Sequence, residues 1–394
     1  MNKIKTKGSL KLLEASRAIA LTVNSLNPAV VSAYPITPQT HIVEDLAKFK
    51  ANGQASYEYV RAESEFAAAS IVLGASALGL RTYSATSSQG LLLMTEVIYN
   101  IAGLRLPVVM TCANRSVSGP INIWNDQQDV MTIRDSGWIL LFAQDHQEAV
   151  SQHILAYKLA ERLKIPVMVN VDGFVLTHAY EPVAIPDKKQ IKKFLPDYKP
   201  TKGEYLDPKQ PMTVGAFATP ADYFEIRQEL HEDLKSSLPL IDQEYKNWQK
   251  IFKNIKTKTD KRIIIIDTGW LEYYGPQKPK CLLVALGSIV GTIKEVINQN
   301  PKIGVLKLKV YRPFPAAEIQ KILKICSKIA VIEKAISLGA TGPLYADLKT
   351  ISGSAKINNY IVGLGGRDVR QAMIKKIIDD IIDNKNNNQV KFIG

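Results

Sequence analysis

The sequence predicts an α/β fold in which helices cover parallel β-sheets. Its 394 residues are 46% hydrophobic and 22% charged, a composition typical of globular domains and unlike that of disordered or collagen-like chains. Short apolar runs alternate with longer stretches of helical spacing over residues 10–171, and the alternation resumes near residue 281. Strands that alternate with helices in this way form parallel sheets with helices on both faces. The length is sufficient for two domains, each with its own core.

In the first half of the chain, five apolar runs are predicted to be strands: residues 29–34, 56–60, 81–85, 107–113 and 166–171. The helices predicted between them cover residues 39–49, 65–78, 90–102 and 147–163. Ligands of such sheets bind where the carboxyl ends of the strands meet the starts of the helices. Functional side chains are therefore expected in the turns that follow the strands.

The alternation stops between about residues 172 and 261, where seven prolines precede a long helix predicted over residues 221–252. We interpret this region as an appendage that wraps the first domain or contacts a partner. A second set of strand–helix units begins near Cys281. The first domain is accordingly predicted over residues 1–255 and the second over residues 256–394.

The net charge of +13 is spread over lysine-bearing stretches and is not gathered in a recognisable nucleic-acid motif. A solvated basic surface is the simplest explanation, with an acidic partner protein as the alternative, and no nucleic acid is expected. No apolar run approaches the roughly 18 residues of a membrane helix, and the first residues do not resemble a secretion signal. A cytoplasmic protein without a membrane partner is therefore expected.

The three cysteines, Cys112, Cys281 and Cys326, are far apart, and the five histidines show no ligand spacing such as HExxH. Neither a disulfide framework nor a zinc site is therefore expected. An iron–sulfur cluster usually needs four thiolates, which this chain does not supply alone. The sequence also has no GxGxxG, Walker A or GDG-type motif that would bind a diphosphate.

Thr37 lies between two prolines, in the sequence YPITP, at the end of the first predicted strand. In a purely structural role, Thr37 would cap the next helix and Pro38 would occupy its first position. The two prolines also stiffen the turn, so the Thr37 hydroxyl is a candidate for ligand binding at the strand end.

Glu65 and Arg115 follow two other strands of the same predicted sheet. The helix dipole alone favours an acidic residue at a helix start, but the apolar residues after Glu65 predict a buried carboxylate that needs a partner. Arg115 provides a guanidinium suited to bidentate carboxylate binding, although a surface arginine is the commoner case. Because parallel strands end at one edge, Thr37, Glu65 and Arg115 are expected to form one site.

Further evidence comes from ten segments, in order along nearly the whole chain: AYPITPQT, VRAESEFAAA, TSSQGLLLM, LRLPVVMTCANR, GPINIWNDQQD, RDSGW, DGFVLTH, YLDPKQP, YRPFP and NNYIVGLGGRD. Together they resemble the alpha subunits of pyruvate:ferredoxin oxidoreductases, within the 2-oxoacid:ferredoxin oxidoreductase family. The resemblance is weakest over residues 260–272, so no role is assigned there.

This resemblance implies a thiamine diphosphate enzyme divided among subunits. The first domain would be its pyrimidine-binding domain, and the second its transketolase C-terminal-like domain. Glu65 matches the glutamate that contacts N1′ of the aminopyrimidine, and Thr37 and Arg115 match the residues that hold pyruvate. A beta subunit would carry the diphosphate site, Mg2+ and a [4Fe-4S] cluster, with gamma and delta subunits completing the enzyme. No metal ligand is implied in this chain.

The implied reaction is the oxidative decarboxylation of pyruvate to acetyl-CoA and CO2, with coenzyme A and ferredoxin as the acceptors. Related enzymes act on 2-oxoisovalerate, 2-oxoglutarate or indolepyruvate, and AYPITPQT does not separate them. GPINIWNDQQD and DGFVLTH look more like the pyruvate enzymes. A non-catalytic basic scaffold or nucleic-acid-binding protein is the more distant alternative.

Overall fold

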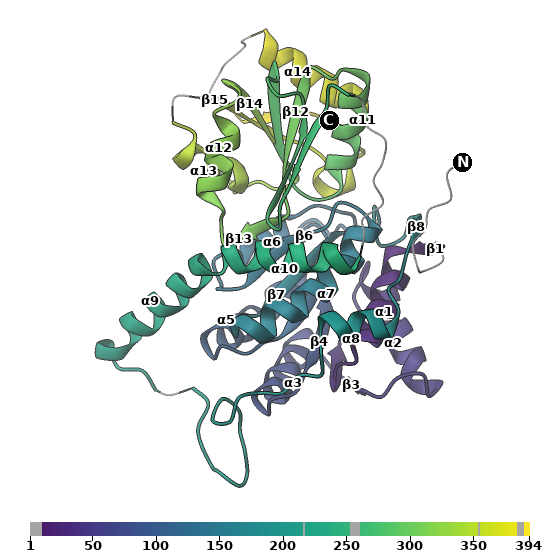
Figure 1. Cartoon of the computed structure of the whole chain (residues 1–394), viewed down its shortest axis with the longest axis vertical. Helices are drawn as coiled ribbons and strands as arrows, with labels where there is room; N and C mark the ends of the chain where they lie inside the picture. Colours follow the sequence, from purple (N-terminus) through teal and green to yellow (C-terminus); the bar gives the residue numbers. More distant parts are fainter. Residues whose placement is uncertain (1–9, 216, 253–260, 354, 384–389) are drawn as a thin grey trace.

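Residues 10–215, 217–252, 261–353, 355–383 and 390–394 are described by the computed structural model, and among them seven strands form the sheet of the first domain (Figure 1). Their order is β13-β6-β7-β5-β4-β2-β3. The parallel strands are β2 (Val30–Ala33), β3 (Glu58–Arg61), β4 (Thr82–Thr86), β5 (Val109–Asn114), β6 (Ile139–Phe142) and β7 (Val167–Asp172). The predicted parallel α/β fold is therefore confirmed.

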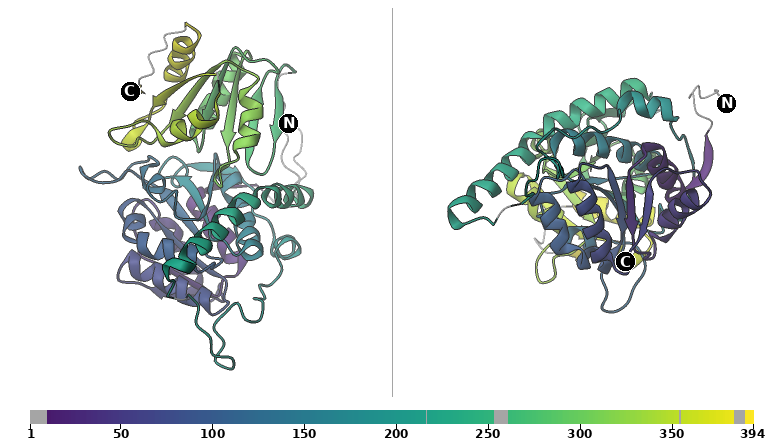
Figure 2. Two further views of the ribbon diagram at one scale, coloured as in Figure 1. Left: turned by 90° about the vertical axis from the view of Figure 1, so that its left-hand side faces the viewer. Right: turned by 90° about the horizontal axis from the view of Figure 1, so that it is seen from below.

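Helices cover both faces of this sheet, as Figures 1 and 2 show. The first face is covered by α1 (Ala15–Leu26), α2 (Thr40–Ala51) and α7 (His146–Leu163), and the second by α3 (Glu65–Ala77), α4 (Ser88–Leu93), α5 (Thr95–Gly103) and α6 (Gln128–Thr132). Side chains alternate between the two cores along each strand: on β5, Val109 and Ala113 join the first core, and Met110 and Cys112 join the second. Such burial on both faces is typical of parallel strands. The sequence did not predict α1, α6 or β6.

Two helices occupy the part of the appendage in which one long helix was predicted. Residues 221–252 are divided at Ser237 into α9 (Pro220–Ser236) and α10 (Leu238–Ile251). The single helix was wrong because Pro239 has no N–H for the carbonyl four residues earlier, and its ring crowds the preceding turn. α10 packs on the first domain, where Trp248 is buried against Phe194 of α8 (Lys188–Phe194). The start of α9 projects away from the body (Figure 1).

A two-stranded antiparallel sheet joins β1 (Lys11–Glu14) to β8 (Tyr180–Val183).

Over the described residues, the second domain has its own seven-stranded sheet, in the order β16-β15-β14-β11-β12-β10-β9. Its strands are β9 (Ile264–Asp267), β10 (Leu271–Gly275), β11 (Cys281–Ala285), β12 (Ile303–Leu308), β14 (Lys328–Glu333), β15 (Lys356–Ile361) and β16 (Lys391–Phe392). Its helices are α11 (Ile289–Gln299), α12 (Ala316–Leu323), α13 (Pro343–Ile351) and α14 (Gln371–Ile382), with a 3-10 turn at Leu364–Gly366. β9 and β10 pair antiparallel, which the strand–helix alternation did not predict.

One strand from the second half of the chain belongs to the first sheet. β13 (Val310–Arg312), which overlaps the start of YRPFP, pairs antiparallel with β6, so that Val310 lies opposite Leu141. The carbonyl of Lys309 extends this pairing by accepting a 2.9 Å hydrogen bond from Phe142 N–H. The two domains are therefore interleaved in sequence. The predicted boundary at residues 255–256 lies outside the described residues.

A buried ion pair joins the two domains. Lys334, directly after β14, lies 3.0 Å from Asp172 at the end of β7, and both side chains are buried. Burial alone would raise the pKa of Asp172, but Lys334 and hydrogen bonds from Ser288 and Gln127 hold that pKa below its usual value. The carboxylate is therefore charged and fully partnered where the domains meet.

The segment without a predicted role, residues 260–272, supplies partners for three lysines, of which Lys307 and Lys309 are buried. Glu272 pairs with Lys294 and lies 3.7 Å from Lys307, and Asp267 pairs with Lys309. Lys307 also pairs with Glu148 of α7 at 2.9 Å, so this network crosses between the domains. Among the described residues of the segment, these carboxylates have a structural role.

Candidate active site

The three predicted site residues lie at one edge of the first sheet. Thr37 follows β2, Glu65 follows β3 and Arg115 follows β5, and these strands run parallel. Parallel strands direct their carboxyl ends to the same edge, so the placement predicted from the sequence is confirmed. The hydrogen bonds and the burial of these residues show details that the sequence did not predict.

Thr37 lies in a turn and does not cap a helix. α2 begins at Thr40, after Gln39, so the capping role for Thr37 and the first helical position for Pro38 were wrong. Instead, the buried amide of Gln39 donates hydrogen bonds to the carbonyls of Tyr34 (3.0 Å) and Ala85 (2.7 Å). These bonds tie the turn to the neighbouring strand β4 and leave the Thr37 side chain exposed.

Arg115 is 7% exposed, so the surface position considered from the sequence was wrong. Its Nη1 donates to the carbonyl of Thr37 and its Nε to the carbonyl of Asn122, both at 2.9 Å. Burial lowers the pKa of Arg115, while the Asp129 carboxylate acts in the opposite direction. Among the described residues, none accepts a hydrogen bond from Nη2. That edge of the guanidinium can therefore bind a carboxylate from outside the chain.

Glu65 is the first residue of α3 and is also 7% exposed. The helix is capped by Ser64, which accepts a hydrogen bond from Ala67 N–H at 3.1 Å, so the Glu65 carboxylate is not needed for capping. Within the described part of the chain, no group donates a hydrogen bond to it. A buried carboxylate in this state is costly unless a ligand or partner supplies the missing contact.

The carboxylate of Glu65 lies against the start of α4, where Gly90 leaves no room for a side chain. A Cβ at Gly90 would lie 2.7 Å from Oε1 of Glu65 and 2.5 Å from Oγ1 of Thr86. The Thr86 hydroxyl is buried and has no hydrogen-bond partner among the described residues. The Glu65 carboxylate and the Thr86 hydroxyl therefore both lie beside Gly90, which has no side chain. No contact joins Glu65 to Thr37 or Arg115 among the described residues.

Asp129 is a site residue that the sequence analysis did not single out. Its buried carboxylate accepts hydrogen bonds from Ser88 N–H (3.0 Å), Arg115 N–H (2.9 Å) and the Asn114 amide (3.0 Å). Burial raises the pKa of Asp129, and these three hydrogen bonds act in the opposite direction. The carboxylate therefore joins the turns that follow β4 and β5. The only sequence signal was its place in the polar run at residues 122–129.

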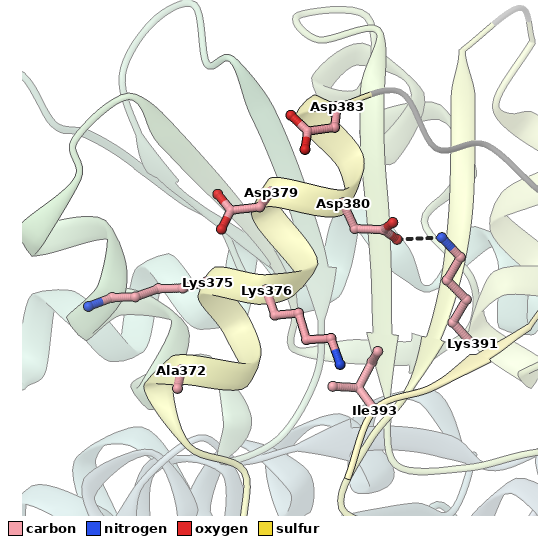
Figure 3. A pocket seen from close by; sticks show the side chains of 8 residues that line it. All are labelled: Ala372, Lys375, Lys376, Asp379, Asp380, Asp383, Lys391 and Ile393. Carbon is pink, nitrogen blue, oxygen red and sulfur yellow. Dashed lines mark hydrogen bonds and ion pairs between the residues drawn. The ribbon is translucent and has the colours of Figure 1, made fainter.

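Two observations concern the rest of the molecule. Among the described residues, no group of three or more His, Cys, Asp or Glu side chains is placed to hold a metal ion. A cavity of about 490 Å³ lies on the outer face of α14, where Lys391 pairs with Asp380 (Figure 3). Its lining residues are Ala372, Lys375, Lys376, Asp379, Asp380, Asp383, Lys391 and Ile393. The three lysines and three aspartates balance, so this surface does not select a charged ligand.

The comparisons with known proteins identify the family of this chain. Residues 22–247 match the family model "Pyruvate flavodoxin/ferredoxin oxidoreductase, thiamine diP-bdg", and residues 280–374 match "Pyruvate:ferredoxin oxidoreductase core domain II". The chain belongs to the pyruvate:ferredoxin oxidoreductase family. It is therefore a subunit of an oxidoreductase, and its first domain is of the thiamine-diphosphate-binding type.

Relatives within this family match almost end to end. The pyruvate synthase subunit PorA of Methanocaldococcus jannaschii is 42% identical over 388 residues, which cover 96% of each chain. The ketoisovalerate oxidoreductase subunit VorA of Pyrococcus abyssi is 37% identical over 94% of this chain and 93% of its own. The solved 2-oxoglutarate:ferredoxin oxidoreductase from Magnetococcus marinus has a TM-score of 0.72 at 20% identity, covering 97% of this chain and 67% of that one. This last likeness is one of fold. Within the described residues, no helix combines the length and hydrophobicity of a membrane span.

Proposed function

We propose that this chain is the alpha subunit of an enzyme that oxidatively decarboxylates pyruvate to acetyl-CoA and CO2 and passes the electrons to ferredoxin. The observation that carries the proposal is the buried Glu65 carboxylate, which lies beside the Thr86 hydroxyl and in close contact with Gly90. A buried carboxylate without a hydrogen-bond donor among the described residues is expected to have a partner in the assembled enzyme. The aminopyrimidine of thiamine diphosphate has a nitrogen, N1′, that suits this role.

Glu65 holds the proton at N1′ in this proposal, and the Thr86 hydroxyl offers a second hydrogen bond beside it. Gly90 allows Glu65 to lie close to the backbone of α4, because any larger residue there would overlap the carboxylate. When bound, thiamine diphosphate supplies the carbon nucleophile and the electron sink that decarboxylation needs. The contribution of the chain is a positioned acid–base group in a site with little access for water.

Arg115 and Thr37 bind the substrate. Nη2 of Arg115 pairs with the carboxylate of the 2-oxoacid, while Nε and Nη1 are held by backbone carbonyls of the chain itself. The exposed Thr37 hydroxyl donates a hydrogen bond that orients the substrate. Because the turn is anchored through Gln39, the two contacts approach the substrate from fixed positions.

The partner that completes the site is a beta subunit that carries the diphosphate site, Mg2+ and a [4Fe-4S] cluster, with gamma and delta subunits completing the cytoplasmic enzyme. Three cysteines cannot provide the four thiolates of such a cluster. Large apolar side chains are exposed in the turns at the edge that carries the site: Tyr34, Ile121, Trp124 and Val175. Grouped exposure of this kind supports a protein partner at that edge. Neither a membrane nor nucleic acid is part of the assembly.

Pyruvate is favoured over the alternatives by the order of similarity. The seven relatives named for pyruvate synthase are 39–43% identical to this chain, and the one named for ketoisovalerate is 37% identical. 2-Oxoisovalerate and 2-oxoglutarate remain the substrates to compare with it. Coenzyme A accepts the acetyl group.

The test uses the enzyme assembled with its native partners, compared with the isolated chain. Ferredoxin reduction is expected to be faster with pyruvate than with 2-oxoisovalerate or 2-oxoglutarate, and the isolated chain is expected to be colourless and inactive. Glu65→Gln keeps the size of the side chain and should lower turnover by about 10²-fold or more, with assembly intact. Unchanged turnover in this variant would remove Glu65 from the mechanism, and turnover by the isolated chain would refute the division among subunits.

A further inference from the structure

The loop after β5 is held by the second domain through Asn122. Its Nδ2 donates a hydrogen bond to the carbonyl of Gly365 at 3.1 Å, across 243 residues of sequence. Its Oδ1 accepts hydrogen bonds from the Ser116 hydroxyl (2.8 Å) and Trp124 N–H (2.7 Å). The side chain of Asn122 is therefore fixed from three sides, one of them in the other domain.

The backbone of the same residue holds the substrate-binding arginine. The carbonyl of Asn122 accepts the hydrogen bond from Nε of Arg115 at 2.9 Å. The direction of that carbonyl therefore sets the plane of the guanidinium. An arginine side chain has several rotatable bonds, so a fixed acceptor at Nε limits where Nη2 points.

The glycine-rich turn at residues 363–366 is shaped to hold this loop. Gly365 has a φ of +58°, and a Cβ there would lie 2.8 Å from Nδ2 of Asn122. Gly365 N–H also donates a hydrogen bond to the buried carboxylate of Asp126 at 3.1 Å. The turn and the loop thus exchange two hydrogen bonds in opposite directions. A side chain at Gly365 would displace Asn122.

We propose that Asn122 is a positioning residue for Arg115 and that the turn at residues 363–366 sets it, so that the second domain orients the guanidinium that binds the 2-oxoacid. This inference rests on the proposed role of Arg115 in substrate binding. It assigns to the NNYIVGLGG segment a function in the first domain's site, and it makes the docking of the two domains a condition for tight substrate binding.

Two variants test the proposal from opposite sides of the contact. Asn122→Ala removes the three side-chain hydrogen bonds but keeps the carbonyl that Arg115 uses. Gly365→Ala changes only the second domain. Its matched control is Gly353→Ala, because Gly353 has the same φ of +58° and no atom of the described residues lies within 4 Å of its Cβ position. The control for the loop is Ser118→Ala, at an exposed position of the same loop.

In the assembled enzyme, Asn122→Ala and Gly365→Ala are expected to raise the KM for pyruvate about tenfold, as for a misplaced ionic contact. The kcat and the KM for coenzyme A should change less, and both control variants should match the wild type. Phenylglyoxal, which modifies arginine, should label Arg115 faster in both variants. Because this labelling is also measured on the full chain without partners, a variant that fails to assemble still gives a result.

The proposed function and this inference can fail separately. If Arg115→Lys leaves the KM for pyruvate unchanged, the substrate role of Arg115 is refuted. If Arg115→Lys raises it while Asn122→Ala shows wild-type KM and labelling, the positioning role is overturned and the proposed function stands. A lower melting temperature with unchanged KM would likewise overturn it. Equal KM and equal labelling for Gly365→Ala and Gly353→Ala would show that the second domain does not orient Arg115.

Discussion

Gly90→Ala adds one methyl group at the point where Glu65 meets α4. The new Cβ would lie 2.7 Å from Oε1 of Glu65 and 2.5 Å from Oγ1 of Thr86, whereas ordinary contacts begin at 3.4 Å. Relief of the overlap requires Glu65 to move by about 0.7 Å and Thr86 by about 0.9 Å. Glu65 yields first, because its carboxylate is the free end of a flexible side chain and no described residue holds it.

A displacement of this size is expected to lower turnover by about 10²-fold, because an acid–base group misplaced by about 1 Å loses its alignment with the reacting atoms. The effect on stability should be much smaller. Alanine is favoured over glycine in a helix by about 1 kcal/mol, which offsets part of the overpacking cost of about 1–3 kcal/mol. Activity and stability are therefore expected to separate.

The assay is pyruvate-dependent ferredoxin reduction by the assembled enzyme at saturating thiamine diphosphate, together with urea unfolding of the chain. Gly291→Ala is the control, because Gly291 also lies in a helix, α11, and no atom in the described part of the chain lies within 4 Å of its Cβ position. It should keep full turnover. If Gly90→Ala has the same turnover as Gly291→Ala in an intact assembly, the placement of Glu65 beside Gly90 has no part in catalysis.

Three further predictions concern other parts of the molecule. Thr37→Val keeps the carbonyl that binds Arg115 and removes a hydroxyl that caps no helix, so the KM for pyruvate should rise about tenfold with no change in melting temperature. A wild-type KM would contradict substrate binding by Thr37. Lys334→Met leaves the buried Asp172 without its cation and should lower the free energy of unfolding by about 3–5 kcal/mol. Lys48→Met, at an exposed pair, should lower it by less than about 0.5 kcal/mol. Equal losses of the two variants in urea unfolding would refute the importance of the buried pair. Burial raises the pKa of Glu333 from 4.5 to about 8, so the folded protein binds this proton more tightly than the unfolded chain does, and the stability gained below pH 4.5 is lost as the pH rises to about 8. The free energy of unfolding should therefore fall with pH in that window by up to about 1.4 kcal/mol per unit relative to Glu333→Gln, and parallel pH profiles for the two proteins would contradict this.

The parts of the site that were predicted are those that depend on chain order. Thr37, Glu65 and Arg115 could be placed at one edge because each follows an apolar run and because strand–helix–strand units have a fixed hand. The contacts between them could not be predicted. Arg115 is buried because Thr37 and Asn122 turn their carbonyls toward it, and a residue's neighbours in sequence do not reveal where carbonyls converge.

The sequence by itself determined the parallel α/β class, the edge that carries the site and the shortage of thiolates for a cluster, because each depends on local periodicity or on composition. Only the tertiary structure decided that Asp129 joins the turns after β4 and β5, that β13 completes the first sheet and that Gly365 holds Asn122. The physical reason is that a polar group is stable in the interior only where its partners converge. Those partners come from segments far apart in the chain, so they become visible only when the chain is folded.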